Sequence, residues 1–255
     1  MSNIKKAFEN GKAFIAFITC GDPDLETTKA AVIAAVKGGA DLIELGIPFS
    51  DPTAEGPVIQ GANLRALNGG VTTDKIFDFV VDLRKKVSVP MVFMTYANVV
   101  YSYGSEKFIG RCKNIGIDGL ILPDLPFEEK EEFEDTCDKY EVDLISLIAP
   151  TSAGRIAMIA KEAKGFIYIV SSLGVTGTRS NITTDVNSIV KVVRETTDTP
   201  CAIGFGISTP EQAAKYSSIS DGAIVGSAII KLLEKHGKDA PAYIEDYVHS
   251  MKEAM

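Results

Sequence analysis

The sequence contains few of the side chains on which the commonest enzyme chemistries depend. Only two histidines are present, His236 and His249, and both lie close to the carboxyl terminus. A catalytic histidine and a histidine-ligated metal ion are therefore not expected, and no metal site is predicted. If the protein moves a proton, carboxylates, tyrosines or lysines must carry it.

Cysteine is also scarce, and its spacing argues against a disulfide framework. The cysteines lie far apart and form no Cys-x-x-Cys pair, in a chain of 255 residues that can bury a core without cross-links. We therefore expect reduced thiols and a cytoplasmic protein. The four residues are Cys20, Cys112, Cys137 and Cys201.

The sequence lacks both a membrane-spanning run and a basic patch. No apolar stretch approaches the ~20 residues needed to cross a bilayer. Residues 13–19 follow Lys5 and Lys6, but this run is at the short end for a signal peptide and is predicted to be a first strand behind a short helix. The formal net charge of −8 disfavours phosphate backbones and anionic lipids. Neither a nucleic acid nor a membrane is a predicted partner.

Eight short apolar runs recur along the chain. They lack polar alternation, which is typical of parallel strands that are buried on both faces. Segments with helical spacing lie between them. The predicted strands are residues 14–19, 41–46, 90–94, 119–122, 143–148, 166–170, 201–204 and 222–225. The predicted helices are residues 27–37, 73–86, 106–114, 128–140, 153–164, 186–195, 210–216 and 228–236.

This alternation predicts eight parallel βαβ units. In about 250 residues, that number closes a (β/α)₈ TIM barrel, an α/β fold formed here by one domain over residues 1–255. Extra helices are expected at the amino terminus and over residues 240–255. An open doubly wound sheet is the alternative. Against it, the single Gly-x-Gly, at Gly204 and Gly206, lacks the third glycine of a dinucleotide fingerprint.

In such a barrel the chemistry lies on the loops that follow the strands, among them residues 47–57, 95–103 and 171–184. Glu44 stands inside the second predicted strand, where a buried charge is costly. It is either a core carboxylate paired to a neighbour or a general acid whose pKa is raised by an apolar wall. The loop after it carries Asp51 and Glu55, which could form an acidic site or a solvated surface turn.

The later loops are rich in glycine, serine and threonine. Residues 204–208 and Gly226-Ser227 each follow a strand and open a helix, so their backbone N–H groups are suited to a phosphate. Residues 174–179 could close over the same ligand. These glycines could also serve only tight turns, but the clustering of three such loops favours a phosphate site.

Several segments of the chain resemble those of a known family. The segment LIELGIPFSDPTAEGPVIQ, residues 42–60, strongly resembles the signature of the tryptophan synthase alpha chain family. Further segments resemble the family in the same order along the chain, so the resemblance covers essentially the whole sequence. They are residues 14–23, 96–98, 123–126, 174–177, 204–208 and 226–228.

The resemblance implies a lyase that splits indole-3-glycerol phosphate into indole and glyceraldehyde 3-phosphate by retro-aldol cleavage. It implies that Glu44 is the general acid and base, that Glu55 is the second catalytic carboxylate and that Tyr168 is the active-site tyrosine. Other matching positions imply the binding site. Phe17, Met94 and Ile121 would line the indole pocket, Thr176 would belong to the mobile loop, and Gly177, Gly206, Gly226 and Ser227 would hold phosphate.

One position departs from the family, which usually has aspartate where this chain has Glu55. The added methylene puts the efficiency of cleavage in question, because a displacement of about 1 Å at a reacting centre can cost on the order of a hundredfold in rate. A subunit that binds a phosphate ligand and mainly activates its partner is therefore one alternative. Another phosphate-binding barrel enzyme, such as an isomerase, is a second.

The resemblance also implies a partner, the tryptophan synthase beta chain, in an α₂β₂ heterotetramer. Asp51, Pro52, Asp124 and residues 96–98 are the candidate contacts. Pyridoxal phosphate is expected only in that beta chain, and no cofactor is expected in this subunit.

Overall fold

The computed structural model describes residues 2–170, 185–204 and 206–255. Over these residues the strands form one parallel sheet in the order β5-β4-β3-β2-β1-β9-β8-β7-β6. The strands are β1 (Ala13–Thr19), β2 (Leu42–Gly46), β3 (Met91–Met94), β4 (Gly119–Ile121), β5 (Asp143–Leu144), β6 (Ser146–Ile148), β7 (Ile167–Val170), β8 (Cys201–Gly204) and β9 (Gly222–Val225).

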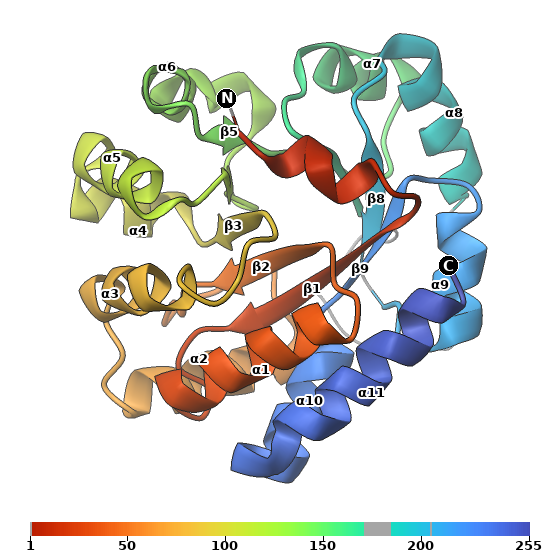
Figure 1. Cartoon of the computed structure of the whole chain (residues 1–255). Coiled ribbons are helices and arrows are strands. Elements are labelled where there is room, and N and C mark those ends of the chain that lie inside the picture. Colours follow the sequence, from red (N-terminus) through yellow and green to blue (C-terminus); the bar gives the residue numbers. More distant parts are fainter. Residues whose placement is uncertain (1, 171–184, 205) are drawn as a thin grey trace.

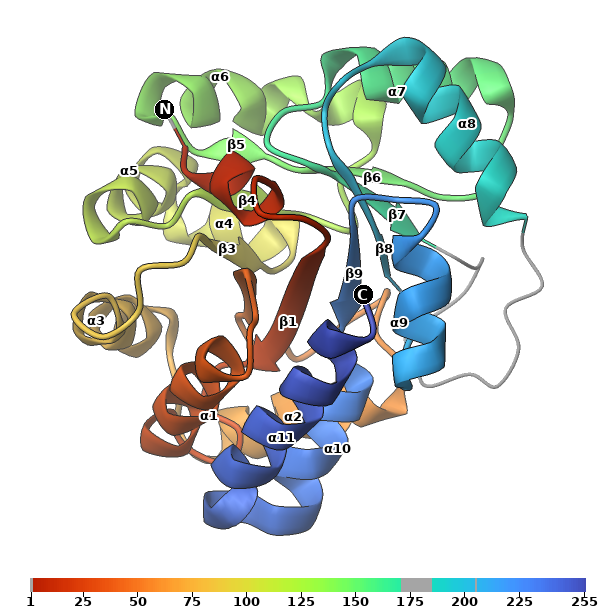
Figure 2. The same ribbon diagram turned by 45° about the vertical axis from the view of Figure 1, so that its right-hand side comes forward.

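The two ends of this sheet belong to one stretch of chain, which closes the barrel. Strands β5 and β6 are separated only by Ile145, whose N–H donates to the Leu120 carbonyl at 2.9 Å. β5 pairs with β4, and β6 pairs with β7. The predicted strand over residues 143–148 is therefore divided into two short strands, and the ring of strands lies inside a shell of helices (Figures 1 and 2). The (β/α)₈ barrel is confirmed, and the open-sheet alternative is wrong.

Each predicted helix is present with small changes at its ends. The helices are α1 (Leu25–Lys37), α3 (Thr73–Leu83), α5 (Ser105–Ile115), α6 (Glu131–Tyr140), α7 (Ala153–Glu162), α8 (Val186–Thr196), α9 (Pro210–Ser217) and α10 (Ser227–His236). The extra terminal helices are η1 (Ile4–Phe8) and α11 (Ala240–Glu253), and two single turns are η2 (Phe127–Glu129) and η3 (Gly237–Asp239). None of the helices in the described part of the chain is long and apolar enough to span a membrane.

Two helices were not predicted. α2 (Pro57–Asn68) directly follows the acidic loop, with proline in its first turn and Gly69 after its last residue. α4 (Ala97–Tyr103) occupies most of the stretch expected to be a loop over residues 95–103. It has seven residues, of which only Val100 is buried, so its sequence has no apolar stripe that would indicate a helix.

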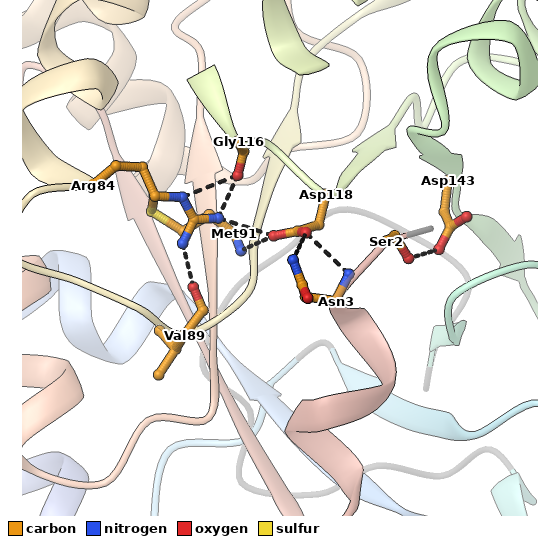
Figure 3. Close-up of polar contacts among 8 residues, drawn as sticks. All are labelled: Ser2, Asn3, Arg84, Val89, Met91, Gly116, Asp118 and Asp143. Atoms are coloured by element: carbon orange, nitrogen blue, oxygen red, sulfur yellow. Dashed lines mark hydrogen bonds and ion pairs between the residues drawn. The ribbon is translucent and has the colours of Figure 1, made fainter. Parts of the chain in front are cut away.

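The amino-terminal segment closes the end of the barrel at which the strands begin. Ile4 is fully buried, and Asn3 donates two hydrogen bonds to the Asp118 carboxylate, both at 3.0 Å. The Ser2 hydroxyl contacts Asp143, the first residue of β5 (Figure 3). Because this end is closed by packing, the ligand site must lie at the opposite end.

Candidate active site

A cavity of about 430 Å³, partly open to solvent, lies where the strands end. Its walls come from five strand residues, from α2, and from the segments that open α9 and α10. An apolar cavity with a few polar groups at this end is the usual binding site of a barrel enzyme. The lining residues are Phe17, Glu44, Ile59, Met94, Tyr168, Gly206, Ile207, Ile224, Gly226 and Ser227.

The register of the strands explains why residues far apart in sequence meet here. Phe17 lies opposite Glu44 across the β1–β2 pair, and aligned residues on neighbouring parallel strands point to the same face. Met94 is likewise aligned with Ile121 across β3 and β4. Ile121 is fully buried at this level but is not among the residues that line the cavity.

Two strand-end glycines make room for the aromatic walls. A Cβ on Gly46 would lie 2.7 Å from the Phe17 ring, and one on Gly204 would lie 2.5 Å from the Tyr168 hydroxyl oxygen. Neither distance is tolerable, so any larger residue would displace the ring. These two glycines therefore shape the cavity.

Glu44 is the buried acid of the cavity. Its side chain is 1% exposed, and its Oε2 has no hydrogen-bond partner among the described residues. Burial raises the pKa of the Glu44 carboxyl to about 8, so the group is largely protonated at neutral pH. The pKa of Tyr168 is also raised, first by burial and then by the Glu44 charge. Glu44 is thus placed as a proton donor beside a buried phenol.

Glu55 is buried as well, but its carboxylate does not line the cavity. It accepts a hydrogen bond from the Tyr96 hydroxyl, which in turn accepts the N–H groups of Thr53 at 3.0 Å and Ala54 at 2.9 Å. Burial raises the pKa of Glu55, whereas the bond from Tyr96 opposes that rise. The loop is therefore anchored at Glu55, whereas Ser50, Asp51 and Thr53 are exposed, as residues of a surface turn would be.

Tyr96 is a residue whose role the sequence analysis missed. Residues 96–98 were predicted only as partner contacts, yet Tyr96 is 2% exposed and turns inward to Glu55. Its backbone neighbour Ala97 donates its N–H to Asp124, at 3.0 and 3.2 Å to the two oxygens. A tyrosine just after the third strand was the available signal.

Three of the four predicted phosphate residues line the same cavity. Gly226 and Ser227 line it at the first turn of α10, and Gly206 lines it from the loop after β8 with φ of +96°. A helix that begins at the cavity wall presents free N–H groups and a positive dipole end. The predicted residues Thr176 and Gly177 lie outside the described residues.

A (β/α)₈ barrel with a buried acid on its second strand, facing a cavity where the strands end, defines the class of the protein, a barrel enzyme. A family model described as tryptophan synthase alpha chain matches residues 2–255. The tryptophan synthase alpha chain of Lacticaseibacillus casei is 49% identical over all of this chain and 96% of its own length. The chain belongs to the tryptophan synthase alpha chain family.

Solved structures agree. Tryptophan synthase subunit alpha from Legionella pneumophila superposes with a TM-score of 0.90 at 36% identity, over 100% of this chain and 98% of that one. A chain in a tryptophan synthase complex from Pyrococcus furiosus superposes with a TM-score of 0.87 at 31% sequence identity, over 95% of this chain and 99% of that one. Family membership makes this chain a carbon–carbon lyase that cleaves indole-3-glycerol phosphate to indole and glyceraldehyde 3-phosphate.

Proposed function

We propose that Glu44 performs the proton transfers of the cleavage. The observation that carries this proposal is a buried carboxyl whose Oε2 has no partner among the described residues and whose pKa is raised to about 8, in a cavity with apolar walls. Such a group holds a proton at neutral pH and can both give and take one. Tyr168, which is buried close by, completes this side of the site.

The reaction then follows from one protonation. Glu44 donates its proton to the ring carbon that carries the glycerol chain, which converts the indole to an indolenine with a cationic nitrogen. The Glu44 carboxylate left by this step takes the proton of the glycerol hydroxyl on the adjacent carbon, and the oxygen of that hydroxyl becomes the carbonyl of glyceraldehyde 3-phosphate. The carbon–carbon bond breaks, and its electron pair returns to the ring to give indole. The protonated ring is itself the electron sink, so this subunit requires no cofactor.

The substrate would lie across the cavity with its two ends held by different elements. Phe17 and Met94 would pack on the ring, with Ile121 behind them, while Gly206, Gly226 and Ser227 would bind the phosphate together with Gly177. Thr176 would belong to the loop over this site. Glu55 would stabilise the positive charge near the ring nitrogen. Because Tyr96 holds the Glu55 carboxylate outside the cavity, that role requires the loop to shift.

The beta chain of tryptophan synthase is the proposed partner, in an α₂β₂ assembly in the cytoplasm that includes the single domain of residues 1–255. Asp51 and Asp124 are exposed on loops that follow the second and fourth strands, and Tyr101 on α4 is 73% exposed. This face carries the cavity, so indole could pass directly to a chain docked here. The Pyrococcus furiosus relative is itself described as part of a tryptophan synthase complex.

The first test is indole release from indole-3-glycerol phosphate by the purified chain, with and without its beta chain. We expect release in both conditions, with a higher rate when the partner shifts the Glu55 loop. Release only with the partner would mean that docking is required to bring Glu55 into the cavity. No release in either condition would overturn the assignment of the cleavage to these residues.

The Tyr96→Phe substitution tests how Glu55 is positioned. It removes the hydroxyl that holds the Glu55 carboxylate outside the cavity and that accepts from Thr53 and Ala54, so we expect kcat of the chain alone to rise, by up to about tenfold, toward its value with the beta chain. KM should stay nearly constant because Tyr96 does not line the cavity. Tyr101→Phe on the exposed face of α4 is the matched control. A wild-type kcat in Tyr96→Phe would contradict the positioning role.

A further inference from the structure

The carboxyl-terminal helix α11 lies outside the eight βα units but reaches the loop that opens α9. α11 packs against α1, α9 and α10 along one side of the barrel (Figures 1 and 2). From its third turn, the Tyr247 hydroxyl donates a hydrogen bond to the Ser208 carbonyl at 3.0 Å. Ser208 is two residues beyond Gly206, which lines the cavity.

Both backbone polar groups of Ser208, its N–H and its carbonyl, are hydrogen-bonded to side chains. Its N–H donates to Gln212 Oε1 at 2.8 Å, within the cap of α9, while its carbonyl accepts from Tyr247. Ser208 directly follows the cavity wall, because its neighbour Ile207 lines the cavity and is 2% exposed. Gly206 has φ of +96°, a conformation that glycine adopts readily and that lets the backbone approach a ligand closely. The Tyr247 bond therefore acts on the backbone that faces the ligand.

We propose that Tyr247 is a positioning residue for phosphate binding: the hydroxyl of α11 fixes the Gly206–Ser208 backbone at the distance from Gly226 and Ser227 that a phosphate requires. This inference rests on the proposed phosphate site. It gives α11, which supplies no residue to the cavity lining, a part in substrate affinity.

Contacts elsewhere hold α11 in place without Tyr247. Ile244, Val248 and Met251 are fully buried, and Lys252 donates to the Lys12 carbonyl at 2.5 Å and to Asp41 at 2.6 Å. Removing one hydroxyl therefore leaves the helix docked. Only the tether to Ser208 is lost.

The test compares Tyr247→Phe with Tyr243→Phe, which makes the same chemical change at a 49% exposed position of the same helix. In Tyr247→Phe we expect KM for indole-3-glycerol phosphate and the inhibition constant of inorganic phosphate to rise together, about three- to tenfold, with kcat nearly unchanged. The inhibition constant of indole should not move, because its contacts come from other elements. Tyr243→Phe should behave as wild type in all four measurements.

A fall in melting temperature with unchanged phosphate affinity would overturn the inference and leave Tyr247 with a structural role only. Ser227→Ala separates this failure from a failure of the site itself. If Ser227→Ala weakens phosphate binding and Tyr247→Phe does not, only the positioning role is wrong. If neither substitution affects phosphate, the proposed phosphate site is wrong as well.

Discussion

Replacing Glu44 with glutamine is expected to lower kcat for indole release by about a thousandfold or more. General acid–base catalysis typically contributes on the order of 10² to 10⁴ in rate, and Glu44 is proposed to serve as both acid and base. Glutamine retains the shape of the side chain but cannot transfer a proton. The measurement is steady-state indole release by the purified chain, with and without the beta chain.

Affinity for phosphate is the internal control for this variant. Glu44 lies on β2, whereas Gly206, Gly226 and Ser227 come from the loops that follow β8 and β9. The inhibition constant of inorganic phosphate should therefore stay within about twofold of the wild-type value, since the substitution changes none of the residues proposed to bind phosphate. Turnover within tenfold of wild type in Glu44→Gln would rule out the proposed role.

The raised pKa of Glu44 gives this prediction a pH dependence with a definite sign. Donation to the ring requires the protonated carboxyl, so kcat should fall as pH rises through about 8. Stability should change in the same direction. The folded-state pKa lies above the ordinary value of 4.5, so this contribution is full below pH 4.5 and is lost as pH rises through 8. Glu44→Gln should lack this loss, which amounts to a few kcal/mol between about pH 5 and 9.

The barrel could be predicted from the sequence because each strand and each outer helix has its own local pattern of apolar residues. Each buried strand is a continuous apolar run and each outer helix has an apolar stripe, so the alternation of the two periods indicates the fold. α4 lacks that stripe, and α2 begins at Pro57, the last residue of the proline-rich loop, so neither helix was predicted. The missed helix α2 is also why Ile59 was not expected in the cavity.

The site residues that lie on strands could be predicted from the sequence, whereas the contacts between loops could not. Phe17, Glu44, Met94 and Tyr168 line the cavity from four strands that the apolar runs of the sequence indicate. The contact between Tyr96 and Glu55 joins two loops whose approach no periodicity encodes. Nor can a strand that is apolar on both faces reveal which residues point inward.

Among the proposed substitutions, loss of the Asp118 carboxylate is expected to lower the free energy of unfolding most. Asp118 is 6% exposed and accepts four hydrogen bonds: from Asn3 N and Nδ2 at 3.0 Å each, from Met91 N at 3.1 Å and from Arg84 at 2.9 Å (Figure 3). Asp118→Ala leaves a half-buried guanidinium without its counter-charge and a buried Met91 N–H without an acceptor. We expect the free energy of unfolding, measured with urea, to fall by about 3–5 kcal/mol.

The reciprocal substitution, Arg84→Met, should cost less, because the Asp118 carboxylate keeps its three N–H donors from Asn3 and Met91. Asp82→Ala is the matched control, since Asp82 is 51% exposed and, among the described residues, forms ion pairs only with Lys29 and Lys85, and it should cost at most about 1 kcal/mol. Asp118 lies where β4 begins, at the end of the barrel opposite the cavity, so kcat per folded molecule should be unchanged. A cost for Asp118→Ala no larger than that of Asp82→Ala would show that the amino-terminal segment is held by Ile4 and its apolar neighbours alone.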